Sequence, residues 1–260
     1  MNLGRSVWAV IRFEFRRSLT LPRILVWWGL VLFPVTLIGL LRYTESFQAE
    51  PTDPIIWGVV LFGLIPEAVC LAGLLLWMSP AIHTELERKT WIYLAVRPDG
   101  RRAILLGKYF TALGWTISAG WTSLLLALPL SGAAPVPRIG LVLSALVVLS
   151  CAGRGAVYAL LAVISPQRAM VLAVAYTMVF EFLVGLIPAL INQFTVQLRL
   201  RSLLVQWMDW SKDLPSESQL LFDPSSTTQH LTLLAIHVFA ALSIAVFVLE
   251  HRQFATSDEG

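Results

Sequence analysis

The sequence predicts an all-α membrane protein with six transmembrane helices. An N-terminal amphipathic interfacial helix is expected before the first span, and short re-entrant or interfacial helices before the last. Apolar residues make up 57% of the 260 residues and charged residues only 13%, whereas a soluble domain carries about 25% charged residues. Six stretches approach the roughly 20 apolar residues that a helix needs to cross a bilayer. Lysine and arginine gather in alternate connecting segments. This composition argues against a soluble enzyme, a disordered chain and a disulfide-built protein.

Residues 5–20 are expected to form the amphipathic helix. Apolar residues recur at helical spacing, and arginines lie largely on the other side. The apolar residues are Val7, Trp8, Ile11, Phe15 and Leu19, and the arginines are Arg5, Arg12 and Arg16. Such a helix lies flat on a membrane with its arginines toward lipid phosphates, and Pro22 would end it before the first span. A basic leader that only fixes topology is the alternative.

The six predicted spans cover residues 24–41, 55–78, 109–130, 139–164, 169–191 and 231–249. The first is expected to be a retained helix, because 23 residues with five arginines precede it and no good small-residue cleavage site follows. Prolines lie within or at the ends of several spans, where membrane helices tolerate them. Cys70 and Cys151 fall in apolar runs, so a disulfide framework is not expected.

The basic residues predict the orientation. With the N-terminus in the cytoplasm, 13 of the 19 lysines and arginines lie in cytoplasmic segments and 5 lie outside, while Arg154 lies inside a span. Both termini are therefore expected in the cytoplasm, in a multi-pass protein of the plasma (cytoplasmic or inner) membrane. The net charge of +3 then reflects cytoplasmic loops, and no nucleic-acid partner is expected.

The inner loop, residues 79–108, is the most informative connecting segment. Ile82, Leu86 and Tyr93 share one face, at offsets of four and seven residues. Charged residues cluster on the remaining surface, namely Glu85, Glu87, Arg88 and Lys89. A turn at 97–100 precedes the next helix. A short charged helix braced by two spans suits docking into a groove on a soluble partner. A solvated connector whose charges only fix topology is the alternative.

The outer loop, residues 192–230, is too apolar for an ordinary solvated loop and too charged to span a membrane. We expect a pair of short re-entrant or interfacial helices here, with Trp207 and Trp210 at the level of the lipid headgroups, because tryptophan marks membrane interfaces. A small extracellular cap packed on its own spans is the alternative.

Three ionisable residues, Glu67, Arg154 and Glu181, lie inside predicted spans. Each is near mid-membrane at 1.5 Å of rise per residue, and each is costly in hydrocarbon unless it is paired or faces water. One hypothesis is that Arg154 pairs with Glu67 or Glu181 and holds the bundle together. The other is that one of the three lines a substrate pathway. Gly153 and Gly155, on either side of Arg154, would permit a close approach between helices.

The sequence offers no catalytic constellation. The four histidines show no metal-ligand spacing, and no H-E-x-x-H pattern occurs. Neither a catalytic residue nor a metal site is expected.

The inner loop resembles the segment between the second and third spans of ABC-2 type transporter permeases. The matching residues are Glu85, Glu87, Arg88, Thr90, Leu94, Arg97, Pro98, Arg102, Gly107 and Lys108. The layout is similar as well, with six spans, an amphipathic N-terminal helix and a long outer loop before the last span. The chain departs from the family at Lys89, where many members have glycine before the threonine.

The resemblance implies a single ABC-2 type transmembrane domain over residues 1–260. This permease would move a substrate across the membrane, in the direction of export, and would not itself be an enzyme. Two copies of a separate ATPase subunit would bind ATP and magnesium, in agreement with the absence of a G-x-x-x-x-G-K-[ST] run from this chain. A second permease subunit, identical or related, would complete the assembly.

The resemblance also implies that the inner loop holds a coupling helix. Ile82 and Leu86 would pack, and Glu85, Glu87 and Arg88 would make polar contacts with the ATPase. Two alternatives are an intramembrane lipid-modifying enzyme and a non-transporting membrane scaffold. The cargo is left open.

Overall fold

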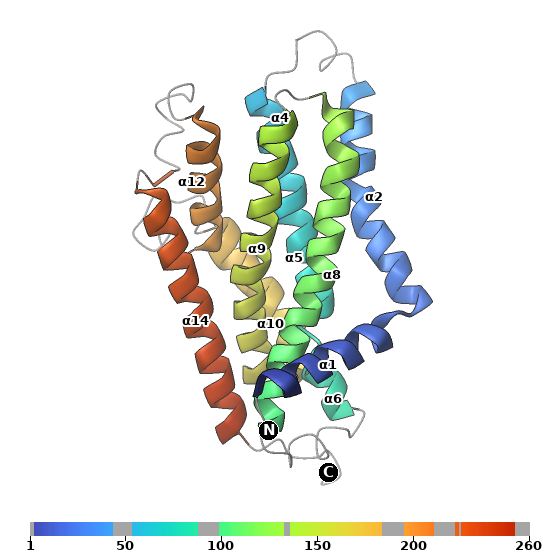
Figure 1. The fold of residues 1–260 in the computed structure, drawn as a ribbon, viewed down its shortest axis with the longest axis vertical. Helices are drawn as coiled ribbons and strands as arrows, with labels where there is room; N and C mark the ends of the chain where they lie inside the picture. Colours follow the sequence, from blue (N-terminus) through green and yellow to red (C-terminus); the bar gives the residue numbers. More distant parts are fainter. Residues whose placement is uncertain are drawn as a thin grey trace.

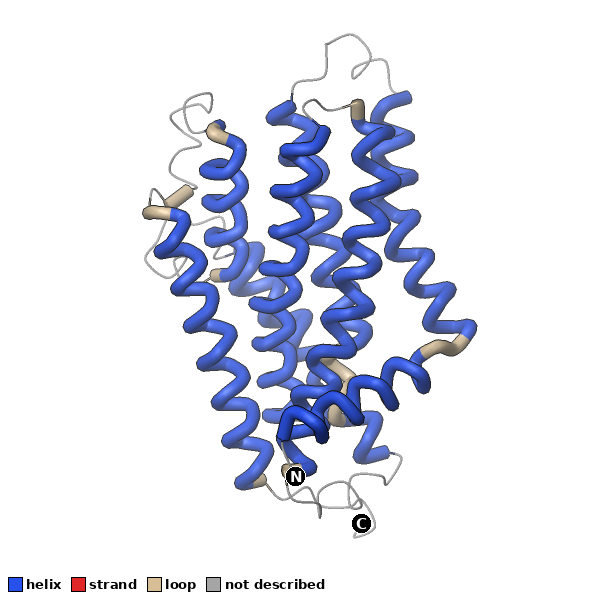
Figure 2. Tube along the Cα trace, in the orientation of Figure 1, coloured by secondary structure: helices blue, strands red, loops and turns tan. Residues whose placement is uncertain are grey.

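The computed structural model describes residues 3–43, 54–87, 99–132, 136–183, 195–210, 222–223 and 225–252. Every regular element in these ranges is a helix (Figure 2). Long helices stand side by side and form one bundle (Figure 1). Five helical runs are long and apolar enough to cross a membrane, and they cover Leu21–Tyr43, Pro54–Trp77, Gly100–Ser131, Val136–Ile164 and Thr227–His251. An all-helical, multi-pass membrane architecture is thereby confirmed.

The first part of the chain follows the predicted order. It comprises α1 (Leu3–Ser18), α2 (Leu21–Tyr43), α4 (Pro54–Phe62), a π-helical segment η1 (Gly63–Val69), α5 (Cys70–Trp77) and α6 (His83–Glu87). Pro22 does not end α1 as expected; it lies in the first turn of α2, where its missing N–H would have no helical partner in any case. The break between the two helices falls at 19–20.

The second part comprises α8 (Gly100–Ser131), α9 (Val136–Ile164), a 3₁₀ turn η2 (Pro166–Arg168), α10 (Ala169–Tyr176), a second π-helical segment η3 (Thr177–Leu183), α12 (Val196–Met208) and α14 (Thr227–His251). The predicted fifth span, 169–191, is described only as far as Leu183, so a count of six spans stays a prediction. Helix α8, which contains the third span, begins at Gly100, ahead of the apolar stretch. The charged residues in its first turns find partners in other helices.

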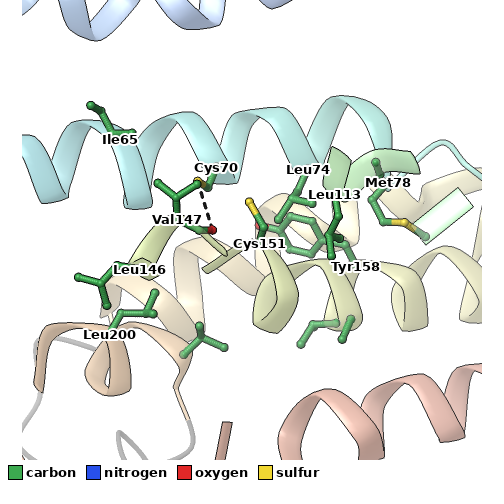
Figure 3. Packing of buried hydrophobic residues seen from close by; sticks show 14 of the residues in the cluster. Ile65, Cys70, Leu74, Met78, Leu113, Leu146, Val147, Cys151, Tyr158 and Leu200 are labelled. Carbon is green, nitrogen blue, oxygen red and sulfur yellow. Dashed lines mark hydrogen bonds between the residues drawn. The ribbon is translucent and has the colours of Figure 1, made fainter. Parts of the chain in front are cut away.

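Helix α9 lies at the centre of the bundle and packs against α8, α12, α14 and α5 (Figure 1). Figure 3 shows Cys70 and Leu74 of α5 facing Val147, Cys151 and Tyr158 of α9. Both cysteines are buried and free, which agrees with the expected absence of a disulfide between them. The central position of α9 means that any polar group on its inner faces must find its partners inside the protein.

Arginines from neighbouring segments bind the carbonyl groups at the C-termini of four helices. Arg42 donates to the Ser131 carbonyl oxygen at the end of α8 (2.6 Å), and Arg138 donates to that of Trp207 at the end of α12 (2.8 Å). At the opposite end of the bundle, Arg101 donates to the Glu250 carbonyl in α14 (2.7 Å) and Arg252 to that of Val163 in α9 (3.1 Å). The last carbonyls of a helix lack intrahelical partners and carry partial negative charge, so these contacts tie the helix ends together.

Helix α1 crosses the end of the bundle where α6 and the C-terminus of α14 also lie, here named the α1 end (Figure 1). Part of its apolar surface packs on α8 rather than facing outward, since Val10 lies against Gly107 and Phe15 stacks on Trp115 at 5.4 Å between ring centroids. Trp8 and Phe13 remain more than half exposed, at 66% and 61%. Contact with lipid is therefore expected from these two aromatic residues.

Two glycines of α8 allow a matched test of this packing. A Cβ atom at Gly107 would collide with Val10, whereas one at Gly114 would meet nothing within 4 Å. Gly114→Ala should stabilise the protein by about 0.5–1 kcal/mol, because alanine is the better helix former. Gly107→Ala should instead destabilise it by about 1–3 kcal/mol through overpacking. Thermal unfolding in detergent measures both, and equal shifts for the two variants would contradict close packing of α1 on α8.

Candidate functional site

An ion cluster lies in the interior of the bundle and joins three segments. Arg154 of α9 is fully buried, and its Nη2 lies 3.2 Å from Glu181 Oε2 of η3. The same nitrogen also contacts Glu67 Oε2 of η1. The sequence left open which carboxylate would pair with Arg154, and the structure contains both pairs. A guanidinium that bridges two carboxylates joins η1, α9 and η3 at one point.

Both acidic members of the cluster lie in π-helical segments. In an α-helix the Cys70 N–H would donate to the carbonyl oxygen of Pro66. Here it donates instead to the carbonyl oxygens of Ile65 and Glu67, so the Pro66 carbonyl lacks its usual partner in its own helix. The Pro66 carbonyl oxygen accepts hydrogen bonds from Ser150 Oγ (2.6 Å) and Arg154 Nη1 (3.0 Å). The altered backbone therefore supplies an extra acceptor for the buried arginine.

Glu181 has several donors besides Arg154. The main-chain N–H of Gln197, in the first turn of α12, donates to Glu181 Oε2 at 3.2 Å, and the Tyr176 hydroxyl donates to Oε1 at 3.4 Å. Thr195 caps α12 by accepting from the Leu198 N–H. The positive end of α12 thus points at a carboxylate inside the bundle, an arrangement that stabilises the negative charge. This environment fits a structural role for Glu181.

Glu67 is in a different environment. Its Oε2 contacts Arg154, while its Oε1 is buried and has no hydrogen-bond partner among the described residues. The side chain lines a cavity of about 500 Å³ between the α4–η1 region and α12. Gln197, Arg201 and Trp210 are the other side chains of the described lining that can form hydrogen bonds, and the remainder of that lining is apolar, with Phe62 and Leu204 as examples. A mostly apolar cavity with a few convergent polar groups is the usual form of a ligand site.

Gly153 and Gly155, on either side of Arg154, let neighbouring helices approach closely. A Cβ atom at Gly153 would lie 3.0 Å from Val196 of α12, and one at Gly155 would lie 3.0 Å from Leu113 of α8. Both distances are tighter than ordinary side-chain contacts, so the neighbouring side chains would have to move apart. The close approach predicted from the sequence is confirmed, and it brings the start of α12 next to Arg154.

A second ion cluster lies at the α1 end. Lys108 Nζ of α8 is 2.9 Å from Glu85 Oε1 of α6 and 3.5 Å from Glu14 Oε1 of α1. Arg17 of α1 also approaches the same Glu85 oxygen, at 3.6 Å. Glu85 is only 2% exposed. One carboxylate of the inner loop is therefore bound inside this chain by two basic side chains from two other helices.

The remaining residues of the expected coupling helix divide between interior and surface. Ile82 is fully buried, and Leu86 packs against the core. Glu87 is exposed and lies 3.1 Å from the His83 ring. Arg88 lies outside the described residues. Of the three residues expected to make polar contacts with a partner, Glu85 is thus turned inward and Glu87 is turned outward.

Sequence reasoning missed the partners of Glu85. Arg17 of α1 contacts Glu85, and Glu14, three residues earlier on α1, contacts Lys108, the other partner of Glu85. The available signal was a lone glutamate within an arginine-rich amphipathic helix. The spacing could have shown that the two residues share a face, although only the tertiary structure brings Lys108 to them.

The segment before the last span is described only in part, so the pair of short helices expected there stays a prediction. Within it the structure describes one helix, α12, which is largely buried and packs against α9 and α14. Trp210 does not face outward: this ring is 6% exposed and packs against Gly58 of α4, where a Cβ atom would collide with it. The headgroup level predicted for Trp207 and Trp210 stays a prediction. Trp207 is partly buried against the core. A glycine on the opposing helix provides the space that the indole occupies.

A polar cluster joins α12 to the start of α14. Arg199 Nη1 is 2.9 Å from Asp223 Oδ2 and 3.2 Å from the His230 ring. Burial alone would raise the pKa of Asp223, but hydrogen bonds from Ser225 and the charges of His230 and Arg199 lower it below its usual value. Asp223 is therefore held in its charged form as a partner for Arg199.

Comparisons of the chain with protein-family models, characterised proteins and solved structures gave no match.

Replacement of Arg154 tests the interior cluster. Arg154→Met should destabilise the protein by about 3–5 kcal/mol, because it leaves two carboxylates buried without a cation. Adding Glu67→Gln and Glu181→Gln to that variant should recover most of the loss, because neither carboxylate is then left buried without the guanidinium. Thermal unfolding in detergent measures the effect, and Arg12→Met, at an exposed site on α1, should change stability by less than about 0.5 kcal/mol.

Additive losses across the combined variant would contradict a charge-balanced cluster. The same conclusion would follow if Arg154→Met alone were as stable as the parent protein.

Proposed function

We propose that this chain is the permease subunit of an ABC transporter of the ABC-2 type. It would move a substrate across the membrane, in the direction of export, with ATP hydrolysed by a separate ATPase subunit present in two copies. The resemblance of the inner loop supplies the family. Its support in the structure is a helical bundle with an amphipathic helix across one end and a short helix, α6, between the second and third spans (Figure 1).

The observation that carries the proposal is the attachment of α6 to the bundle. Ile82 and Leu86 anchor α6 in the core, and Glu85 joins it to Lys108 of α8 and Arg17 of α1. A connector that only fixed topology would need no such buried ion pairs, because exposed charges satisfy the positive-inside rule equally well. A force applied to α6 would therefore be passed to α1, to α8 and to the helix run that ends at Trp77.

The two glutamates would have separate roles in this scheme. Glu85 would hold α6 on the permease, and the exposed Glu87 would contact the ATPase, together with Arg88. Such a rigid short helix docked in a groove of a partner transmits movement through packing and charge contacts. A second permease subunit, identical or related, would complete the transporter.

Glu87→Arg tests the docking role. The reversed charge should weaken binding of the ATPase subunit about tenfold or more, because like charges face each other at the contact. The fold should be unaffected, since Glu87 is exposed. Binding is measured by co-purification from membranes in mild detergent, and coupling by ATP hydrolysis of the reconstituted complex. Gln167→Arg, an exposed change in the turn between α9 and α10, is a matched control that should leave both readouts unchanged.

Normal ATPase binding and normal coupling in the Glu87→Arg protein would refute the role of α6. If no ATPase subunit co-purifies with the parent chain under these conditions, a membrane scaffold or an intramembrane lipid-modifying enzyme becomes the better functional hypothesis.

A further inference from the structure

A buried histidine joins α12 to the start of α14, at the end of the bundle opposite the α1 end (Figure 1). His230, in the first turn of α14, has no exposed surface, and Arg199 of α12 is 7% exposed. Arg199 Nη1 lies 3.2 Å from His230 Nδ1 and 2.9 Å from Asp223 Oδ2. His230 Nε2 lies 3.3 Å from the main-chain carbonyl oxygen of Asp223. Both ring nitrogens therefore have a partner at the interface between the two helices.

These partners fix the protonation state of the imidazole. A guanidinium only donates hydrogen bonds, so His230 Nδ1 must accept and carries no proton. A carbonyl oxygen only accepts, so the proton of the ring is on Nε2. His230 is therefore neutral in this arrangement, while the charges of Arg199 and Asp223 compensate each other.

Protonation of His230 would disrupt this arrangement. The new N–H at Nδ1 would point at another donor, so the hydrogen bond from Arg199 would be lost. Two positive charges would then share one carboxylate in a buried cluster, which is unfavourable at low dielectric. The charge of Asp223 does not change under mildly acid conditions because, in spite of burial, hydrogen bonds from Ser225 and the neighbouring charges keep its pKa below the usual value.

Among the described residues, the helices packed against α14 bring no second carboxylate to His230. Of the basic residues of α12, Arg199 contacts His230 and Arg201 lines the cavity next to η1. On α9, Arg154 belongs to the interior cluster and Arg138 binds the far end of α12. The basic residues of α8 lie within 100–108, at the α1 end. A charged imidazole would therefore stay uncompensated.

We propose that His230 makes the contact between the first turns of α12 and the start of α14 sensitive to pH. The contact holds while the imidazole is neutral and is released when the imidazole is protonated, below about pH 6.5, where histidine ordinarily titrates. With both termini in the cytoplasm, as the distribution of basic residues predicts, this contact would respond to the pH outside the membrane. The proposal does not depend on the permease assignment.

The position of the contact limits the movement to the first turns of α12. Toward its C-terminus, α12 is held by hydrogen bonds between uncharged groups, such as that from Thr227 Oγ1 to Gln206 Oε1 at 2.8 Å, and these do not respond to pH. At its N-terminus, the main-chain N–H of Gln197 donates to Glu181 of the interior cluster. Release of Arg199, two residues later, would therefore also loosen this contact with the interior cluster.

Hydrogen exchange measured by mass spectrometry tests the proposal on the full chain in phosphatidylcholine nanodiscs. Exchange is compared at about pH 7.5 and about pH 5.5, after correction for the intrinsic pH dependence of amide exchange. We expect protection of the amides of 200–204 and 231–235 to fall about tenfold, because each pH unit below the ordinary pKa of histidine favours the released form about tenfold. These amides bond to carbonyls in the first turns of α12 and α14. Protection in the middle of α9 should not change.

A substitution at His230 identifies the titrating group. His230→Gln keeps a neutral side chain that can both accept and donate, so protection should be the same at both pH values. His230→Asn, which offers an acceptor near the position of Nδ1, serves if the glutamine variant does not fold. His237→Gln is the matched control, because His237 lies about two turns further along α14 and outside the cluster. This control should lose protection at acid pH as the parent protein does.

Three results would overturn the proposal. Unchanged protection of the parent protein at acid pH would mean that the contact does not respond to protons, and this measurement needs no variant. An equal loss in the His230 variants, or no loss in His237→Gln, would assign the effect to another group. A loss that extends equally to α9 would mean general destabilisation by acid. None of these results bears on ATPase binding through α6, which is tested separately.

Discussion

The position of Arg154 constrains the rest of the structure. The guanidinium of Arg154 is fully buried, so its charge must be balanced inside the protein. Nη1 and Nη2 have partners there, whereas Nε has none among the described residues. The partners come from two π-helical segments and from Ser150, one turn earlier on α9. The backbone is altered where it meets the arginine: η1 turns the Pro66 carbonyl toward it, and η3 carries Glu181. Small residues on both sides of Arg154 let α8 and α12 close around it.

The two ion clusters are joined by a short stretch of helix. Glu67 lies in η1, α5 follows directly, and α6 begins a few residues after α5 ends. Eight residues of α5 measure about 12 Å at 1.5 Å per residue. If α6 receives a push from a soluble partner, α5 is the direct helical connection to η1. Single π-helical turns within α-helices are frequently found at functional sites.

Hydropathy and charge counts predicted the elements that depend on local sequence. Five of the spans, the amphipathic α1 and the need of Glu67, Arg154 and Glu181 for partners could be predicted this way, because each rests on composition over a window or on one costly residue. The features that were missed depend on contacts between distant segments. Trp210 resembles an interfacial anchor in the sequence, yet Gly58 on another helix provides a buried slot for it. Glu85 resembles an exposed charge, yet Lys108 and Arg17 arrive from two other helices. Neither π-helical segment has a periodicity signal, although a proline next to an acid at 66–67 marks one of them.

The two carboxylates of the interior cluster are unequal, and one of them also lines the cavity. Glu181 receives donors from α12 and Tyr176 in addition to Arg154, so its charge is stabilised from several directions. Glu67 makes its direct contact with Arg154, and its second oxygen is buried without a hydrogen-bond partner among the described residues. Glu67 therefore belongs both to the cluster that joins three segments and to the lining of the cavity, so a substitution at this one residue would alter both.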